Sequence, residues 1–65
     1  MKIKDARIAI KKAELVLAFV PLNEHDGIRF KISKKEVLSQ LENWDEDMEI
    51  FLDWSPLDSN VLLLN

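Results

Sequence analysis

The segment from residue 15 to residue 32 constrains the fold most, because its pattern is that of a β-hairpin. Residues 28–32 alternate apolar and basic side chains, which is typical of a strand with one face on a core. Residues 15–20 are strand formers with apolar side chains on both faces, so we expect the most buried strand there. Pro21 ends this run, and Asp26-Gly27 is a strong signal for a hairpin turn.

The alternation also assigns the two faces of the second predicted strand. Ile28, Phe30 and Ile32 are expected to point into the core, and Arg29 and Lys31 to point to solvent. We therefore expect residues 28–32 to pair antiparallel with residues 15–20.

A helix is predicted directly after this hairpin. Ser33 and Glu36 form a Ser-x-x-Glu capping box, in which the serine side chain satisfies a free N–H of the first helical turn. Apolar residues follow at helical spacing, at Val37, Leu38, Leu41 and Trp44. The sequence predicts a central helix over residues 34–43.

The segment before the hairpin is less distinctive. Residues 5–13 favour a helix, with Asp5 as its N-cap and an apolar stripe of alanine and isoleucine. Ile8 and Ile10 also alternate with Arg7, Ala9 and Lys11 in a strand pattern, and a single helix over residues 6–19 is a further alternative.

After the central helix, residues 48–54 alternate in the manner of a half-buried strand, and residues 61–64 form a short final strand. Trp44 and Trp54 lie on apolar stripes, so we expect both in the core. The chain is predicted to be one small α+β domain, residues 1–65. Its antiparallel sheet is expected to have about four strands, with a central helix at 34–43 and an N-terminal helix at 5–13.

The composition excludes most kinds of catalytic site. The chain has no cysteine, one glycine and one histidine, so it lacks a thiol nucleophile, a glycine-rich phosphate loop and a set of zinc ligands. A calcium loop counted from Asp45 fails, because Ile50 and Pro56 occupy the positions that need glycine and glutamate. We expect no enzyme, no cofactor and no metal.

Targeting signals are also missing. The longest apolar run, residues 15–22, is too short to span a bilayer, and no signal peptide is visible. We expect a cytoplasmic protein that does not associate with a membrane.

The charges divide the chain into two parts. Residues 1–35 carry all nine Lys and Arg against four acids, a formal charge of +5, whereas residues 36–65 carry eight acids and no base. Such asymmetry indicates binding through charge. Direct binding to nucleic acid is not expected, because the pI is about 5.0.

The acids concentrate in one stretch. Residues 42–58 hold seven of the twelve carboxylates and both tryptophans, without a basic residue. Outward positions on the predicted strand 48–54 are about 6.6 Å apart, which is on the order of the phosphate spacing in nucleic acids. The residues left outside the core are the candidate partner-binding set, named here the acidic surface: Glu42, Asp45, Glu46, Asp47, Glu49, Phe51 and Asp53.

This surface predicts a non-enzymatic inhibitor that occupies a basic, nucleic-acid-binding groove on another protein. In size, acidity and lack of catalytic residues, the chain is similar to phage and mobile-element proteins that block CRISPR or restriction enzymes by mimicking DNA. Two alternatives remain at this point. The first is an assembly module that self-associates through its basic and acidic segments, and the second is an antitoxin or immunity protein. The chain is expected to be a monomer or a homodimer.

Overall fold

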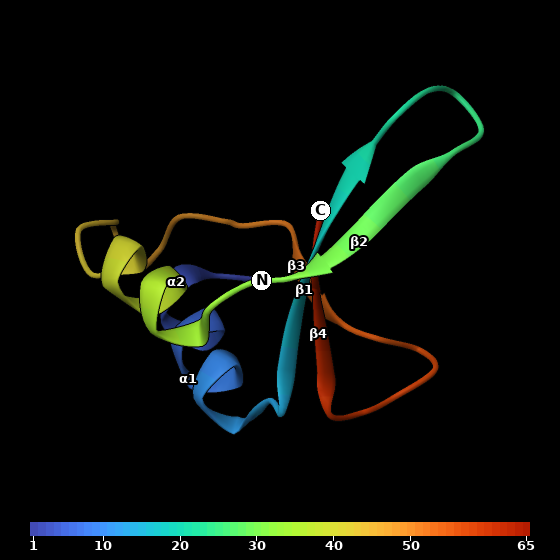
Figure 1. Cartoon of the computed structure of the whole chain (residues 1–65). Coiled ribbons are helices and arrows are strands. Elements are labelled where there is room, and N and C mark those ends of the chain that lie inside the picture. The colour runs from blue at the N-terminus through green and yellow to red at the C-terminus, as the bar shows by residue number, and fades with distance from the viewer.

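A four-stranded sheet organises the computed structural model, which describes residues 1–65 (Figure 1). Both helices lie on one side of this sheet, so the predicted α+β class is confirmed. The elements are α1 (Ile3–Lys12), β1 (Leu15–Pro21), β2 (Gly27–Lys31), α2 (Lys34–Leu41), β3 (Leu52–Trp54) and β4 (Val61–Leu64).

The sheet is mixed. β1 pairs antiparallel with β2, and β3 pairs antiparallel with β4, as predicted. The central pair, β1 with β4, is parallel, with Val16 opposite Leu62. The expectation of an entirely antiparallel sheet is therefore wrong for this pair. Parallel neighbours need a long crossover, and here the chain passes through β2, α2 and β3 between them.

The core lies between the two helices and the sheet face that they cover. The register places Val16, Leu62 and Trp54 in one row on this face. Ile3 and Ile10 of α1 pack there with no exposed surface. The nine buried residues are all apolar: Ile3, Ala6, Ala9, Ile10, Ala13, Val16, Leu41, Leu52 and Leu62.

The N-terminal segment is a helix, which rejects the strand alternative, since Ile8 is 55% exposed while Ile10 is buried. This helix begins at Ile3 rather than after Asp5. The Ile3 N–H donates to the carbonyl oxygen of Met48 at 2.8 Å. The sequence predicts a local N-cap for this helix, at Asp5. Instead, a turn distant in sequence accepts a hydrogen bond from a free N–H at the helix start.

The capping box of α2 is confirmed on the serine side, because Ser33 Oγ accepts from the Glu36 N–H at 3.3 Å. The helix ends at Leu41, two residues before the predicted end. Trp44 therefore lies in the turn beyond the helix and is 46% exposed. Its expected place in the core is wrong, whereas Trp54 in β3 is half-buried as part of the core layer.

The β1–β2 hairpin extends away from the rest of the molecule (Figure 1). β4 ends at Leu64 opposite Ala18, so the hairpin beyond that point is a ribbon of two strands. Ile28 and Phe30 are consequently 50% and 44% exposed, although their alternation predicted burial. β1 is likewise buried only at Val16 and exposed at its far end.

The hairpin turn does not use Gly27 for a left-handed backbone, because the chain has no residue with positive φ. Instead, Asn23 Oδ1 accepts from the N–H groups of His25 and Asp26 at 2.8 and 2.9 Å. Gly27 begins β2, and a Cβ atom there would overlap the ring of Phe19. Glycine at this position allows the close approach of that ring.

The strand predicted over residues 48–54 is regular only from Leu52 to Trp54. The Leu52 N–H donates to the carbonyl oxygen of Ile50 at 2.9 Å, which makes a tight turn centred on Phe51. Before this turn, Glu49 forms one isolated bridge with Lys2. The alternation over residues 48–54 places Met48 on the core face with Ile50, Leu52 and Trp54, but Met48 is 48% exposed, so its expected burial is wrong.

Candidate functional site

All seven residues of the acidic surface are exposed, but they follow a path along the molecule rather than one strand face. Glu42 is the C-cap of α2, and Asp45, Glu46 and Asp47 form the turns beyond it. These turns lie at the end of the molecule away from the hairpin, whereas β3, which contains Asp53, is near its middle (Figure 1). The acids thus form an extended row.

Two of the six acids are paired with cations of the same chain. Glu46 Oε1 lies 3.3 Å from the Arg7 guanidinium, and Glu49 Oε2 lies 3.2 Å from the N-terminal ammonium of Met1. Both carboxylates remain largely exposed, so solvent screens these ion pairs. The other four acids form no ion pair within the chain: Glu42, Asp45, Asp47 and Asp53.

Two of these four acids also shape the local backbone. Asp45 Oδ1 accepts from the Asp47 N–H, and Asp53 Oδ1 accepts from the Trp54 N–H, each at 2.9 Å. Such side-chain to backbone bonds are common for aspartate in turns. They fix the direction of both carboxylates without neutralising them.

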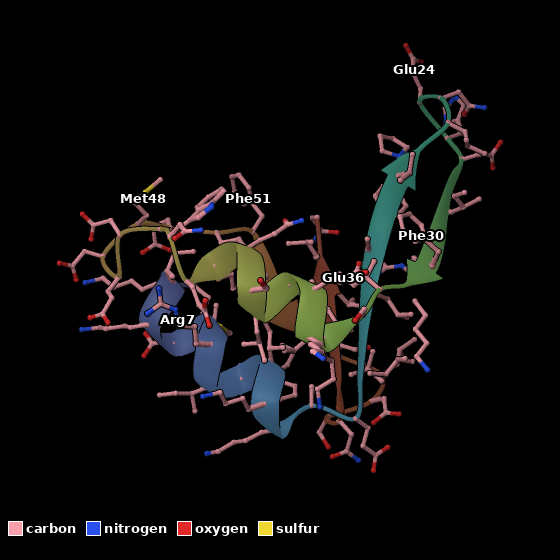
Figure 2. All side chains as sticks on the ribbon, turned by 60° about the vertical axis from the view of Figure 1, so that its left-hand side comes forward. Arg7, Glu24, Phe30, Glu36, Met48 and Phe51 are labelled. Carbon is pink, nitrogen blue, oxygen red and sulfur yellow. The ribbon has the colours of Figure 1, made fainter.

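Phe51 is the apolar member of the surface and is 83% exposed. The tight turn at this residue directs its ring away from the core. Figure 2 shows Phe51 and Met48 projecting from the segment that leads to β3. An aromatic ring exposed among acids is a feature of protein interfaces, where aromatic residues dominate the binding energy.

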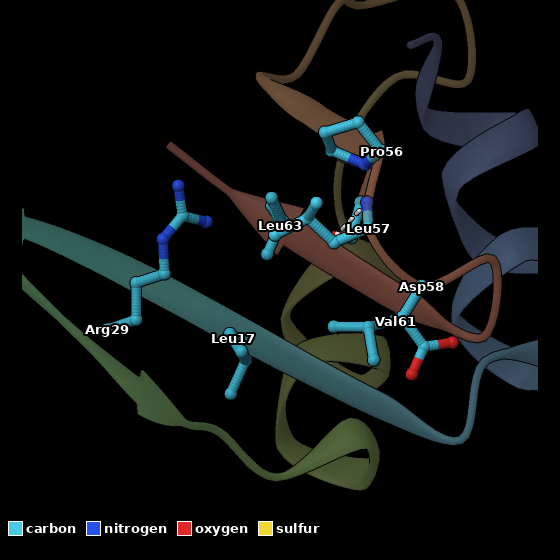
Figure 3. A pocket seen from close by; sticks show the side chains of 8 residues that line it. Leu17, Arg29, Pro56, Leu57, Asp58, Val61 and Leu63 are labelled. Atoms are coloured by element: carbon cyan, nitrogen blue, oxygen red, sulfur yellow. Dashed lines mark hydrogen bonds between the residues drawn. The ribbon is translucent and has the colours of Figure 1, made fainter.

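A second concave region lies on the sheet face opposite the helices. Leu17 and Leu63, together with the loop at residues 55–58, enclose a groove of about 360 Å³ (Figure 3). Arg29 stands at one side of this groove, and Asp58 belongs to the loop. Sequence reasoning missed the groove, although apolar residues on both faces of 15–20 and 61–64 indicated that a second face carries apolar side chains.

The described chain brings together no constellation of catalytic or metal-binding groups. No three His, Cys, Asp or Glu side chains are placed to hold a metal ion. His25, the single histidine, lies exposed in the hairpin turn. Neither helix has the length and apolar character needed to cross a membrane.

Fold and surface together define a class: a small α+β domain with a mixed sheet, two helices on one face and an exposed acidic row. The chain matches no known family, no curated protein and no solved structure.

Proposed function

We propose that this protein is a non-enzymatic binding protein whose acidic surface occupies a basic, nucleic-acid-binding groove on another protein. The observation that supports this most is the 83% exposure of Phe51 between Glu49 and Asp53. Exposed acids attract a basic groove through long-range electrostatic interaction. An aromatic ring that becomes buried in the interface adds binding free energy that the acids alone do not supply.

The charge balance of the surface supports the same function. Four of its six acids have no ion pair within the chain, and the two that do are paired at exposed positions. Unpaired exposed acids raise the rate of encounter with a cationic partner, and salt screens this effect. Association should therefore slow as ionic strength rises.

The mechanism is competitive occlusion, in which the acidic row takes the place of a phosphate backbone. The row is irregular, because the turn at Phe51 interrupts the even spacing of Glu49 and Asp53. The proposed mimicry is thus of negative charge along an extended path, in the manner of anti-CRISPR and anti-restriction proteins, and it needs no match to each phosphate.

The experiment is affinity capture from the host, followed by mass spectrometry and competition with DNA and RNA. Wild-type protein should retain a basic protein that added nucleic acid releases, because both ligands take one groove. A bait with Asp45→Lys, Asp47→Lys and Asp53→Lys should lose this protein. These positions spare the carboxylates of Glu46 and Glu49, which hold ion pairs.

The matched control replaces three exposed acids outside the acidic surface, Glu14→Lys, Glu24→Lys and Asp26→Lys, and so makes the same change in net charge. Glu24 lies at the hairpin tip, far from Met48 and Phe51 (Figure 2). This control bait should capture the same protein as wild type. Unchanged capture by the triple variant, or capture that nucleic acid leaves intact, contradicts the proposal.

A further inference from the structure

The outer edge of β2 carries backbone groups that have no partner within the sheet. β2 is the terminal strand of the order β2-β1-β4-β3. In an antiparallel ladder, alternate residues direct both backbone groups to the neighbouring strand. The Ile32 N–H donates to the Val16 carbonyl oxygen at 3.0 Å, so the even-numbered residues of β2 face β1. Gly27, Arg29 and Lys31 therefore turn their N–H and C=O groups outward.

The side chains of this edge differ between the two faces of the sheet. Arg29 and Lys31 lie on the face that the helices leave open, and the Arg29 guanidinium lies 5.4 Å from the centre of the Phe19 ring. Ile28 and Phe30 lie on the other face and are 50% and 44% exposed. An added strand thus meets two cations on one face and two apolar side chains on the other.

We propose that β2 accepts an added strand from another protein, an extended segment in which acidic residues alternate with apolar ones. Its backbone continues the ladder through the outward groups of Gly27, Arg29 and Lys31. Its acids lie beside Arg29 and Lys31, and its apolar side chains cover Ile28 and Phe30. The period of two in a strand makes these two requirements compatible.

Charge disfavours a second copy of β2 as the occupant. An antiparallel β2–β2 pair that uses the whole strand places Arg29 opposite the same residue of the other copy. A shift by two residues in one direction places Arg29 opposite Lys31 of that copy, and the shift in the other direction places it opposite Gly27, where the ladder runs into the hairpin turn. Like charges directly opposite each other destabilise a sheet, and basic residues on an edge strand commonly prevent self-pairing.

Pairing of β2 with β3 of another copy, the other edge strand of the sheet, is also unfavourable. β3 has three residues, and its outward N–H groups already have acceptors within the chain. The Leu52 N–H donates to the Ile50 carbonyl oxygen, and the Trp54 N–H donates to Asp53 Oδ1, each at 2.9 Å. Head-to-tail pairing of β3 on β2 therefore lacks free donors from β3.

This site and the acidic surface are independent. β2 and β3 are the two ends of the strand order, and Asp53 belongs to β3. A partner strand on β2 leaves the acidic row accessible, so one chain can hold two partners of opposite charge.

The test uses the full chain and a fluorescent seven-residue peptide in which valine and glutamate alternate. Fluorescence anisotropy should show saturable binding, weaker at high salt. A peptide in which valine and lysine alternate should not bind. The valine–glutamate peptide can carry N-methyl groups either on its odd-numbered or on its even-numbered residues. Only one of these two methylated peptides should bind, because a strand pairs with β2 through the N–H groups of one edge, and methylation of those groups prevents pairing.

The variants separate charge from backbone pairing. Arg29→Glu with Lys31→Glu should weaken binding about tenfold or more, since two attractive cross-strand pairs become repulsive. Arg29→Pro removes one outward N–H and none of the bonds to β1, and should also abolish binding. The control, Lys11→Glu with Lys12→Glu on α1, makes the same charge change at exposed positions and should bind normally.

Circular dichroism of each variant establishes whether it folds. If the proline variant does not fold, the charge-reversal variant still tests the proposal. Equal binding of the lysine peptide overturns the proposal, as does unchanged binding by the charge-reversal variant. Concentration-dependent self-association that Arg29→Pro abolishes assigns the edge to a second copy and also overturns it. Binding of single-stranded DNA in place of the peptide has the same consequence.

Discussion

The Arg7 guanidinium donates a 2.6 Å hydrogen bond to the carbonyl oxygen of Leu41, 34 residues further along the chain. Leu41 is the last residue of α2, where carbonyl groups lack partners within the helix. A second bond, of 3.3 Å, reaches the carbonyl oxygen of Trp44 in the following turn. Arg7 thus caps α2 from α1 and holds the start of the acidic row in place.

Replacing Arg7 by methionine should lower the free energy of unfolding by about 1–2 kcal/mol, because the part-buried carbonyl oxygen of Leu41 loses a charged donor. Glu46→Gln removes only the exposed ion pair and should change stability by less than about 0.5 kcal/mol. Urea titrations followed by circular dichroism measure both. Equal losses in the two variants would show that the ion pair, rather than the cap, stabilises this junction.

Lys34 makes a comparable contact at the other end of the helix pair. Its Nζ donates to the carbonyl oxygen of Ala13, the C-cap of α1, at 2.5 Å. Lys34→Met should cost about 1 kcal/mol, whereas the same change at exposed Lys35 should cost little. Thermal melts of the two variants provide the comparison. A larger loss at Lys35 would contradict the role given to Lys34.

Leu62 is fully buried between the helices and the sheet. Leu62→Ala should cost about 2–5 kcal/mol, which is most of the roughly 3–5 kcal/mol that a single core supplies in a domain of this size. The matched control is Leu57→Ala, because Leu57 is 96% exposed, and its change should stay within about 0.5 kcal/mol. The fraction folded at 25 °C, read by tryptophan fluorescence, distinguishes them.

Gly27→Ala should move the Phe19 ring, which occupies the space of the new Cβ atom. The overlapping atoms are at the far end of the Phe19 side chain, which is 37% exposed, so we expect a loss of about 1 kcal/mol rather than unfolding. The same substitution in a Phe19→Ala background should cost less, because the clashing ring is gone. An equal cost in both backgrounds would place the strain elsewhere, at the carbonyl oxygen of Val20.

Local patterns predicted much of the fold correctly. The alternation at residues 28–32 located β2 and its antiparallel pairing with β1, and Ser33 marked the start of α2. These features depend on neighbours within a few residues, so their signals are present in the sequence. The seven residues of the acidic surface were likewise all expected to be exposed, and all of them are.

The predicted burial was wrong where it depended on the length of other elements. Phe30 alternates like a core residue, yet it is 44% exposed because the helices cover only part of the hairpin. Trp44 continues the helical spacing of α2, but the helix stops at Leu41, where Arg7 takes the terminal carbonyl. Period alone does not reveal where a neighbouring element ends.

The sequence by itself determined the types of element after residue 14, the two antiparallel pairings and the separation of basic and acidic segments. Tertiary structure decided the parallel pairing of β1 with β4, the ion pairing of Glu46 and the open edge at β2. The physical reason is the separation along the sequence over which each interaction acts. Hydrophobic period and capping act between residues a few positions apart, whereas strand order and pairing depend on which distant segments bury their apolar faces together.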